Sequence, residues 1–171
     1  MIYGMKQFFS FPNPVNDAAA RTVALGVVAM TLLALVGNTP WLLLPLTYGF
    51  LARVASGPTI SPLGQFAVRV AAPRLSRWQK TVPGPPKRFA QAIGAVFSVS
   101  ATLVWLSVGW GTARWILLPL LAAAALEGFA GFCLGCTIFS WLMKAKLIPQ
   151  SVCEECGDLS ARYAAAGMTQ R

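Results

Sequence analysis

Four apolar stretches dominate the sequence and restrict what the chain can fold into. They run from about residue 18 to 36, 40 to 56, 89 to 110 and 115 to 143. A helix of roughly 17–25 apolar residues is long enough to cross a lipid bilayer. Only 11% of the residues are charged, against about 25% in an ordinary soluble domain. We therefore predict an all-α integral membrane protein with four transmembrane helices arranged as two hairpins.

Composition also excludes several kinds of enzyme and partner. The chain has no histidine, so mechanisms that need a Ser-His-Asp triad or His-ligated zinc are not available. Its formal net charge is +9, which in so apolar a chain indicates a membrane surface rather than nucleic acid. We expect the lipid bilayer, and no nucleic acid, among its partners.

The distribution of basic residues predicts an orientation in the membrane. Turn-forming clusters at residues 37–40 and 111–114 separate the two helices of each predicted hairpin. With four spans, 13 of the 14 Lys and Arg residues fall on one side of the membrane and only Arg114 on the other. Because positive residues concentrate on the cytoplasmic side, we predict a multi-pass protein with both termini cytoplasmic. The outer loops are then residues 37–40 and 111–114.

We predict a single membrane domain over residues 1–171. Its parts are a cytoplasmic N-terminal segment (1–17), a first hairpin (18–56), a basic cytoplasmic connection (57–88), a second hairpin (89–143) and a cytoplasmic tail that contains cysteines (144–171). Asn16 or Asp17 is a suitable helix N-cap for the first span.

The basic connection is predicted to contain an amphipathic helix that lies in the membrane interface. Ser61 and Pro62 suit the N-cap and the first position of that helix, and Pro73 is expected to end it. Its apolar residues recur at the spacing of one helical face and are Leu63, Phe66, Ala67 and Val70.

Basic side chains of the connection are expected to contact anionic lipid headgroups, at about 1 kcal/mol each. The alternative is that these charges only fix the topology of the chain. The residues concerned are Arg69, Arg74, Arg77, Lys80, Lys87 and Arg88.

Four cysteines carry the chemistry that the sequence offers, and they form two Cys-x2-Cys pairs: Cys133 with Cys136, and Cys153 with Cys156. This spacing is typical of a four-thiolate metal site and also of two dithiol pairs that exchange with each other. The fourth apolar stretch is longer than a bilayer requires, so the first pair is expected one helical turn apart near the cytoplasmic boundary, close to the tail. Structural disulfides are disfavoured because that compartment is reducing.

Three interpretations of the cysteines remain open. Thiol redox or sulfur chemistry needs a reactive thiolate and a resolving partner. Metal binding needs all four thiolates, with zinc as the typical ion. Alternatively, the first pair consists simply of small apolar helix residues. Lys144 and Lys146 would stabilise a nearby thiolate, and the two glutamates of the second pair would oppose this there. Cys133 or Cys136 is therefore the better nucleophile candidate.

Glu127 lies within the fourth apolar stretch, where an ionised side chain costs about 2.5–3.5 kcal/mol. We expect it to be protonated, paired or directed into a polar cavity, and it is a candidate proton or ligand site. Gly131 and Gly135 form a small-xxx-small pair that is expected to pack this helix against another. An internal hydrogen bond is the alternative role of Glu127, and the hydroxyl partners on the third span are Ser98, Ser100 and Thr102.

Several segments together resemble a bacterial membrane family catalogued as domain of unknown function 4395. They are Phe-Pro-Asn-Pro-Val-Asn (11–16), Ser-Pro-Leu-Gly (61–64), Val-Pro-Gly-Pro-Pro-Lys-Arg-Phe-Ala-Gln (82–91), Gly-Phe-Cys-Leu-Gly-Cys (131–136) and Cys-Glu-Glu-Cys (153–156). The resemblance covers nearly the whole chain and implies the bacterial inner (plasma) membrane, but it brings no settled activity. The Gly-Phe-Cys segment is also similar to small membrane proteins associated with rhodanese and thioredoxin-like partners, which favours thiol or sulfur chemistry.

We accordingly predict a membrane-anchored thiol/disulfide or sulfur-handling protein that uses both Cys-x-x-Cys pairs at the cytoplasmic membrane surface. One pair would exchange with a thioredoxin- or rhodanese-like partner, and the other would resolve the mixed disulfide. The alternative is a non-enzymatic accessory or structural subunit of a larger membrane complex, whose four cysteines bind a structural zinc. Four helices enclose too thin a path for a solute, so transport would require an oligomer or a larger complex. Whether the protein is an enzyme is left open.

Overall fold

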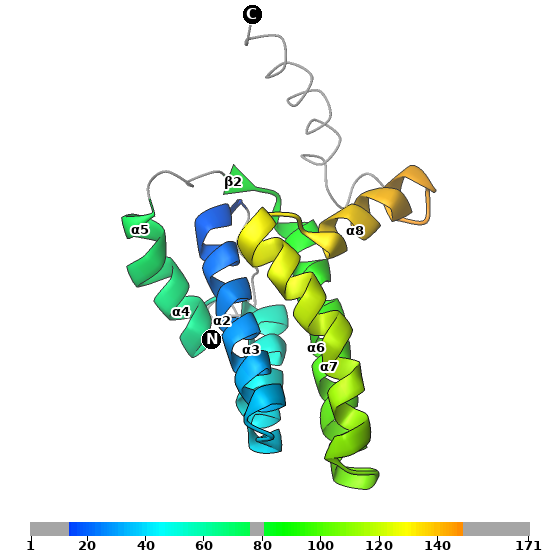
Figure 1. The fold of residues 1–171 in the computed structure, drawn as a ribbon. Coiled ribbons are helices and arrows are strands. Elements are labelled where there is room, and N and C mark those ends of the chain that lie inside the picture. Colours follow the sequence, from blue (N-terminus) through cyan, green and yellow to red (C-terminus); the bar gives the residue numbers. More distant parts are fainter. Residues whose placement is uncertain (1–13, 76–80, 149–171) are drawn as a thin grey trace, which may run out of the picture.

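The structure is a computed structural model, and it describes residues 14–75 and 81–148. These residues are mostly helical, with one two-stranded antiparallel ladder (Figure 1). Three helical segments are long and apolar enough to cross a membrane: Asp17–Val36, Gly84–Ser107 and Trp110–Ala130. The predicted all-α class is therefore confirmed, with three candidate spans among the described residues.

The elements follow one another in this order. Strand β1 (Val15–Asn16) leads into α2 (Asp17–Val36), and the 3-10 turn η1 (Pro40–Leu42) leads into α3 (Leu43–Ser56). A short helical unit follows, made of α4 (Pro62–Phe66), the π-helical η2 (Ala67–Ala71) and α5 (Ala72–Arg74). After β2 (Thr81–Val82) come α6 (Gly84–Ser107), α7 (Trp110–Ala125), the π-helical η4 (Leu126–Ala130) and α8 (Leu134–Lys144).

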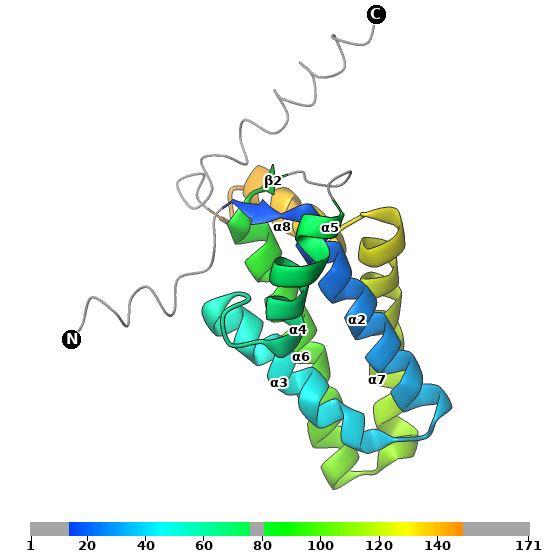
Figure 2. The ribbon, with the colours of Figure 1, turned by 90° about the vertical axis from the view of Figure 1, so that its left-hand side faces the viewer.

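The four long helices α2, α3, α6 and α7 form an elongated bundle. Helix α6 packs against both α3 and α7, and α2 packs against α7 and η4. Figure 2 shows the α2–η1 turn and the α6–α7 turn at one end of the bundle, and β1, β2, α5 and α8 at the other. We call this second end, which carries the β1–β2 ladder, the ladder end.

The ladder places the beginnings of α2 and α6 side by side. Val15 pairs with Val82 and Asn16 with Thr81 in antiparallel register. Asn16 then caps α2, because its side-chain oxygen accepts a hydrogen bond of 2.9 Å from the backbone N–H of Ala18. The prediction of Asn16 as an N-cap is confirmed. As a consequence, the first residue of α2 lies close to the first turn of α6.

The core of the bundle is built from large apolar side chains set against small ones. Leu43 and Leu117 are completely buried, and Phe50 is almost so. Burial of each such side chain stabilises the fold by about 1.5–3 kcal/mol. The ring of Phe50 occupies the space that a side chain at Gly94 would need. Helices α3 and α6 can therefore approach closely at this point.

The helical unit α4–η2–α5 agrees in part with the predicted interfacial helix. Ser61 caps it as predicted, accepting a 3.2 Å hydrogen bond from the backbone N–H of Gly64. Ala67 is buried against α2, and Phe66 of the same predicted face is exposed on the surface of the protein. Pro73 lies one residue before the end of this continuous helical unit at Arg74, so the helix ends one residue later than predicted.

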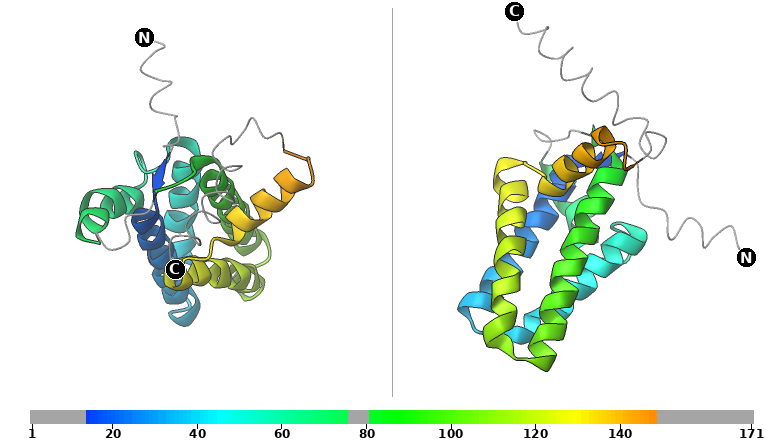
Figure 3. Two further views of the ribbon diagram at one scale, coloured as in Figure 1. Left: turned by 90° about the horizontal axis from the view of Figure 1, so that it is seen from above. Right: turned by 90° about the vertical axis from the view of Figure 1, so that its right-hand side faces the viewer.

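The fourth apolar stretch is not one continuous helix, contrary to the prediction. Gly131 ends η4 with a left-handed backbone (φ 70°) and its N–H bonds to the carbonyl of Glu127. Glycine adopts this conformation without a Cβ clash. Helix α8 then leaves the bundle axis sideways (Figure 3). Gly131 and Gly135 therefore do not share a helix, and the predicted small-xxx-small pair is wrong.

The turn between α6 and α7 is also displaced from its predicted position. The chain reverses at Val108 and Gly109, where Gly109 has φ 115°, and α7 already begins at Trp110. Residues 111–114 belong to the first turns of α7, and Ala113 is buried in the bundle. The other turn lies at residues 37–39, as predicted.

Candidate functional site

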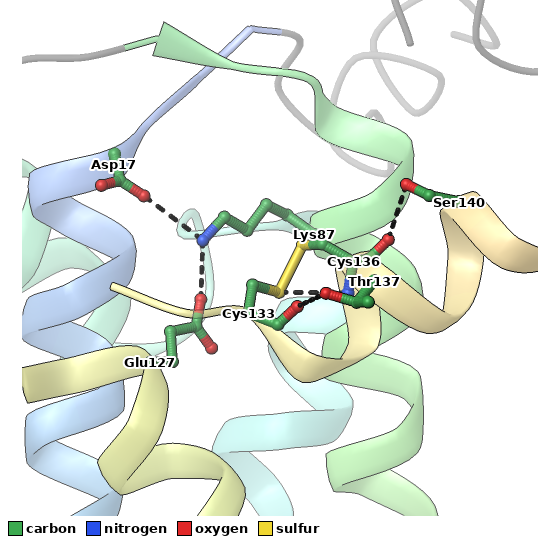
Figure 4. The surroundings of a disulfide bond; sticks show 7 residues. All are labelled: Asp17, Lys87, Glu127, Cys133, Cys136, Thr137 and Ser140. Carbon is green, nitrogen blue, oxygen red and sulfur yellow. Dashed lines mark hydrogen bonds and ion pairs between the residues drawn. A yellow bond between two sulfur atoms is a disulfide. The ribbon is translucent and has the colours of Figure 1, made fainter. Parts of the chain in front are cut away.

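Cys133 and Cys136 form a disulfide at the N-terminus of α8 (Figure 4). Their Cα atoms lie 5.2 Å apart, and both residues are partly exposed. Cys133 is the N-cap residue, and its Sγ accepts a hydrogen bond of 3.2 Å from the backbone N–H of Cys136. The expectation that disulfides are disfavoured here does not hold for this pair. Cys133 precedes α8 in extended backbone and Cys136 lies in the first turn of α8, so the turn between them is the first of a new helix and not part of the preceding span.

The N-terminus of α8 provides an electrostatic environment that suits a thiolate. Backbone N–H groups of a first helical turn point out of the helix, and the helix dipole adds partial positive charge there. A cysteine at such a position is stabilised as thiolate when it is reduced. Lys144 does not contribute as predicted, because it lies at the other end of α8, eight residues or about 12 Å beyond Cys136.

A buried cluster of charged side chains lies beside the disulfide at the ladder end (Figure 4). The Lys87 ammonium is 2.7 Å from Oε1 of Glu127 and 3.4 Å from Oδ1 of Asp17. Asp17 also pairs with Arg21, with 3.4 Å between Oδ2 and Nε. Lys87 is only 5% exposed. We call these four residues the ion-pair cluster.

Three elements deliver these charges to one place. Asp17 opens α2, Lys87 lies in the first turn of α6, and Glu127 belongs to η4. A lysine at the beginning of a helix is opposed by the helix dipole. The two carboxylates offset this repulsion and the loss of hydration that accompanies burial. The cluster therefore ties α2, α6 and η4 together at the ladder end.

Two sequence predictions are corrected by this geometry. Lys87 does not contact lipid headgroups, because the first turn of α6 directs it inward, between α2 and η4. Glu127 binds Lys87 rather than a hydroxyl of α6, so of the three predicted environments it has the paired one. It lies three residues before the end of its span at Ala130.

Five further basic residues were predicted to contact lipid headgroups, and the structure describes three of them. Arg69, Arg74 and Arg88 are exposed, and Arg88 also donates a 3.0 Å hydrogen bond from Nε to the carbonyl of Val54. Their contact with headgroups stays a prediction. Arg77 and Lys80 lie outside the described residues.

Arg53 is a second buried cation, near the end of α3. It is 5% exposed; Nε donates to Oε1 of Gln91 at 2.8 Å and Nη1 to Oγ of Ser61 at 3.2 Å. Its guanidinium carbon lies 4.7 Å from the centre of the Phe50 ring. Among the described residues, the buried Nη2 atom has no hydrogen-bond partner.

Two cavities adjoin the ion-pair cluster, and a third of about 200 Å³ also has Arg53 in its lining. One of about 270 Å³ lies among α2, α6, α7 and α8, and its lining is apolar except for Glu127 and Gln91. Leu134 and Gly135, the residues between the two cysteines, also line it. The other, of about 250 Å³, lies among α2, α3, α4 and α6, and both Arg53 and Lys87 line it. We call this second one the cation cavity.

The predicted zinc site depends on residues of which the structure says nothing. Cys153 and Cys156 lie outside the described residues. Within residues 14–75 and 81–148, no three His, Cys, Asp or Glu side chains are grouped so as to hold a metal ion. Cys133 and Cys136 offer no thiolate ligands while they are bonded to each other. A four-thiolate site therefore stays a prediction that requires the reduced protein.

Sequence reasoning missed the pairing of Lys87 with Glu127, although one signal was present. Asp17 and Glu127 are the only acids between residues 14 and 148. An acid inside an apolar span usually pairs with a cation of a neighbouring helix. No local pattern, however, indicates which of the many basic residues that cation is.

These features define an all-α protein of membrane type, with a buried ion-pair cluster and a Cys-x2-Cys disulfide at one end of its bundle. Residues 15–144 match the profile of a family described as Domain of unknown function (DUF4395). The chain belongs to this family, and the resemblance noted from the sequence is confirmed. Neither a curated protein nor a solved structure matches the chain. The matched region includes Cys133, Cys136 and the ion-pair cluster and ends before Cys153.

Proposed function

We propose that the protein is a membrane-anchored thiol–disulfide protein whose redox-active pair is Cys133 and Cys136. The observation that carries this proposal is the position of their disulfide at the N-terminus of α8, partly exposed, with the sulfur of Cys133 accepting a backbone N–H. A structural disulfide is typically well shielded, whereas a Cys-x2-Cys pair at a helix N-terminus is accessible to a partner thiol.

The proposed reaction is a two-electron exchange with a thioredoxin-like dithiol of the cytoplasm. One thiolate of the partner attacks the sulfur of Cys133, the bond between the two cysteines breaks, and Cys136 leaves as thiolate. The second partner thiolate then attacks the mixed disulfide and releases Cys133. The partner is oxidised to its disulfide, the protein is reduced to its dithiol, and the two protons pass from the partner's thiols to the two cysteines. A rhodanese-like sulfur donor is the alternative partner.

The surrounding residues act in this proposal as positioning residues. The bond between Glu127 and Lys87 fixes η4 against α6, six residues before Cys133. Gly135 lies so close to α6 that a Cβ atom there would come within 2.6 Å of the Cα of Ala90. These two contacts fix the chain against α6 before and after Cys133. If Cys153 or Cys156 attacks the mixed disulfide at Cys133 in place of the second partner thiolate, the partner leaves as its thiolate and the disulfide passes to the second pair.

The proposal includes the orientation predicted from the basic residues. Segment η1–α3, 17 residues from Pro40 to Ser56, would be the fourth span, at the lower limit of length for a bilayer. Both termini and the ladder end would then face the cytoplasm of a bacterium. Support comes from Arg114, which lies in the first half of α7, near the end of the bundle opposite to the disulfide (Figure 1).

Trapping of the mixed disulfide tests the redox assignment. In a Cys153→Ser/Cys156→Ser background, Cys136→Ser leaves the Cys133 thiolate free to attack an oxidised thioredoxin, and we expect a covalent adduct on a non-reducing gel. The matched variant, Cys133→Ser in the same background, should form much less adduct. Loss of the intact Cys133–Cys136 disulfide on incubation with thioredoxin, its reductase and NADPH should be visible by thiol alkylation.

Two results would contradict the proposal. One is a disulfide that stays intact under those conditions, with no adduct from either variant. The other is about one tightly bound zinc per chain, with no thiols that react until a chelator is added. That second result would favour the structural zinc site in an accessory subunit of a larger complex.

The orientation has a separate test. Single cysteines introduced at Asn38 and at Arg69 in a cysteine-free protein should be labelled by an impermeant maleimide from opposite sides of the membrane. Asn38 should react in intact cells and Arg69 only after permeabilisation. The reverse pattern, or labelling of both from outside, would overturn the orientation and leave the redox test unaffected.

A further inference from the structure

We propose that the cation cavity is a binding site for a small oxyanion, such as a carboxylate, phosphate or sulfate group, held by Arg53 and Lys87. This inference does not depend on the proposed thiol chemistry. It rests on the charge of the buried residues, on an unsatisfied guanidinium nitrogen and on the lining of the cavity.

Arg53 is a buried cation with no acid within ion-pair distance in the part of the chain that the structure describes. Glu127 acts on it electrostatically but is bound to Lys87. Asp17, the only other acid between residues 14 and 148, is paired with Arg21 and Lys87. A buried charge without a counter-charge is strongly unfavourable. A bound anion would supply the counter-charge that Arg53 lacks.

Both cations have donors to spare. Arg53 uses Nε and Nη1 in hydrogen bonds, while its Nη2 is buried with no partner among the described residues. An ammonium group has three hydrogens, and Lys87 has two acid partners in the described part of the chain. A guanidinium presents its N–H groups in a planar fork that matches the oxygens of a carboxylate or phosphate.

The lining of the cavity suits an anion. Arg53 and Lys87 enter it from α3 and α6, and the amides of Asn16 and Gln91 are close by. No Asp or Glu is among its lining residues. The remaining walls are small or apolar, and include Ala20 of α2. A volume of about 250 Å³ is several times the roughly 30 Å³ of one water molecule.

The same oxyanion chemistry has two sources at a membrane boundary. A soluble ion would enter from the water phase, and a phospholipid headgroup would enter from the bilayer with its acyl chains left outside. The two sources are distinguished by the experiment rather than by the lining of the cavity, which accepts either.

Binding is measured with purified full-length protein in a non-ionic detergent and in nanodiscs. In detergent, inorganic phosphate, sulfate and acetate are titrated calorimetrically at constant ionic strength against chloride. In nanodiscs, native mass spectrometry compares retention of phosphatidylglycerol with that of phosphatidylcholine. Arg53→Gln removes the charge, Ala20→Leu fills the cavity and leaves every charge in place, and Arg69→Gln removes an exposed charge as the matched control.

We expect the wild type and Arg69→Gln to bind alike, and both Arg53→Gln and Ala20→Leu to bind at least tenfold more weakly. Binding of the free ions identifies a soluble anion, whereas retention of phosphatidylglycerol alone identifies a lipid headgroup. The inference is overturned if no probe binds the wild type, or if Arg53→Gln and Arg69→Gln weaken binding equally. Thermal unfolding of each variant without anion verifies that it is folded, and Ala20→Leu keeps the test decisive if Arg53→Gln is not.

Discussion

Replacement of Lys87 by methionine is the sharpest test of the ion-pair cluster. Methionine has a similar length and no charge, so Lys87→Met leaves the carboxylate of Glu127 without its 2.7 Å partner, while Asp17 keeps Arg21. Removing one member of a buried ion pair costs about 3–5 kcal/mol, because the other charge stays buried and unpaired. We expect a loss of this size in the free energy of unfolding.

A double-mutant cycle separates the pair from general damage. Glu127→Gln alone should cost less than Lys87→Met, since Lys87 keeps its contact with Asp17. The double variant Lys87→Met/Glu127→Gln has no orphaned acid on η4 and should recover about 2 kcal/mol relative to the sum of the single variants. Arg88→Met is the matched control, because Arg88 is the next residue of α6 and is exposed. We expect it to cost less than about 1 kcal/mol.

The assay is equilibrium unfolding in mixed detergent micelles with increasing SDS, followed by the fluorescence of the six tryptophans and by circular dichroism. Our account of the cluster would be refuted by a cost below 1 kcal/mol for Lys87→Met, or by a cost equal to that of Arg88→Met. Single-variant costs that add to within 0.5 kcal/mol in the double variant would refute it as well.

Three further predictions concern a strained glycine, a packing glycine and a helix cap. Gly131→Ala should destabilise the protein by about 1–2 kcal/mol or more, since an L-residue is strained at φ 70°, and trypsin should cut the segment before α8 faster. Gly94→Ala should cost about 1–3 kcal/mol in SDS unfolding, because its methyl group would overlap the buried ring of Phe50; Gly111→Ala, in open space on α7, should instead be neutral or stabilising by up to about 1 kcal/mol. Asn16→Ala should lower the free energy of unfolding by about 1 kcal/mol, because it removes the N-cap of α2. An unchanged midpoint of thermal unfolding would argue against the cap.

Much of the fold follows from local features of the sequence. Apolar composition over about 20 residues identifies helices that can cross a bilayer. Any helix that lies in the hydrocarbon interior must be apolar over about this length. Asn16 and Ser61 mark helix beginnings through hydrogen bonds to backbone N–H groups two or three residues away. The family was also recognisable from short segments of the chain. Such features need no knowledge of the rest of the structure.

Other features depend on how the helices pack, and only the tertiary structure decided them. Lys87 lies 40 residues from Glu127 and 70 from Asp17 along the chain. Its place among the basic residues of the connection indicated a surface position. Whether it is buried depends on the direction in which the first turn of α6 faces, which the β1–β2 ladder fixes. Gly131 shows the same limit, since a glycine in an apolar run fits either close helix packing or a left-handed helix end. The structure has the left-handed end, which stops the preceding helix and redirects the chain. Because a new helix can begin only after the preceding one has stopped, this end places Cys133 at the N-terminus of α8.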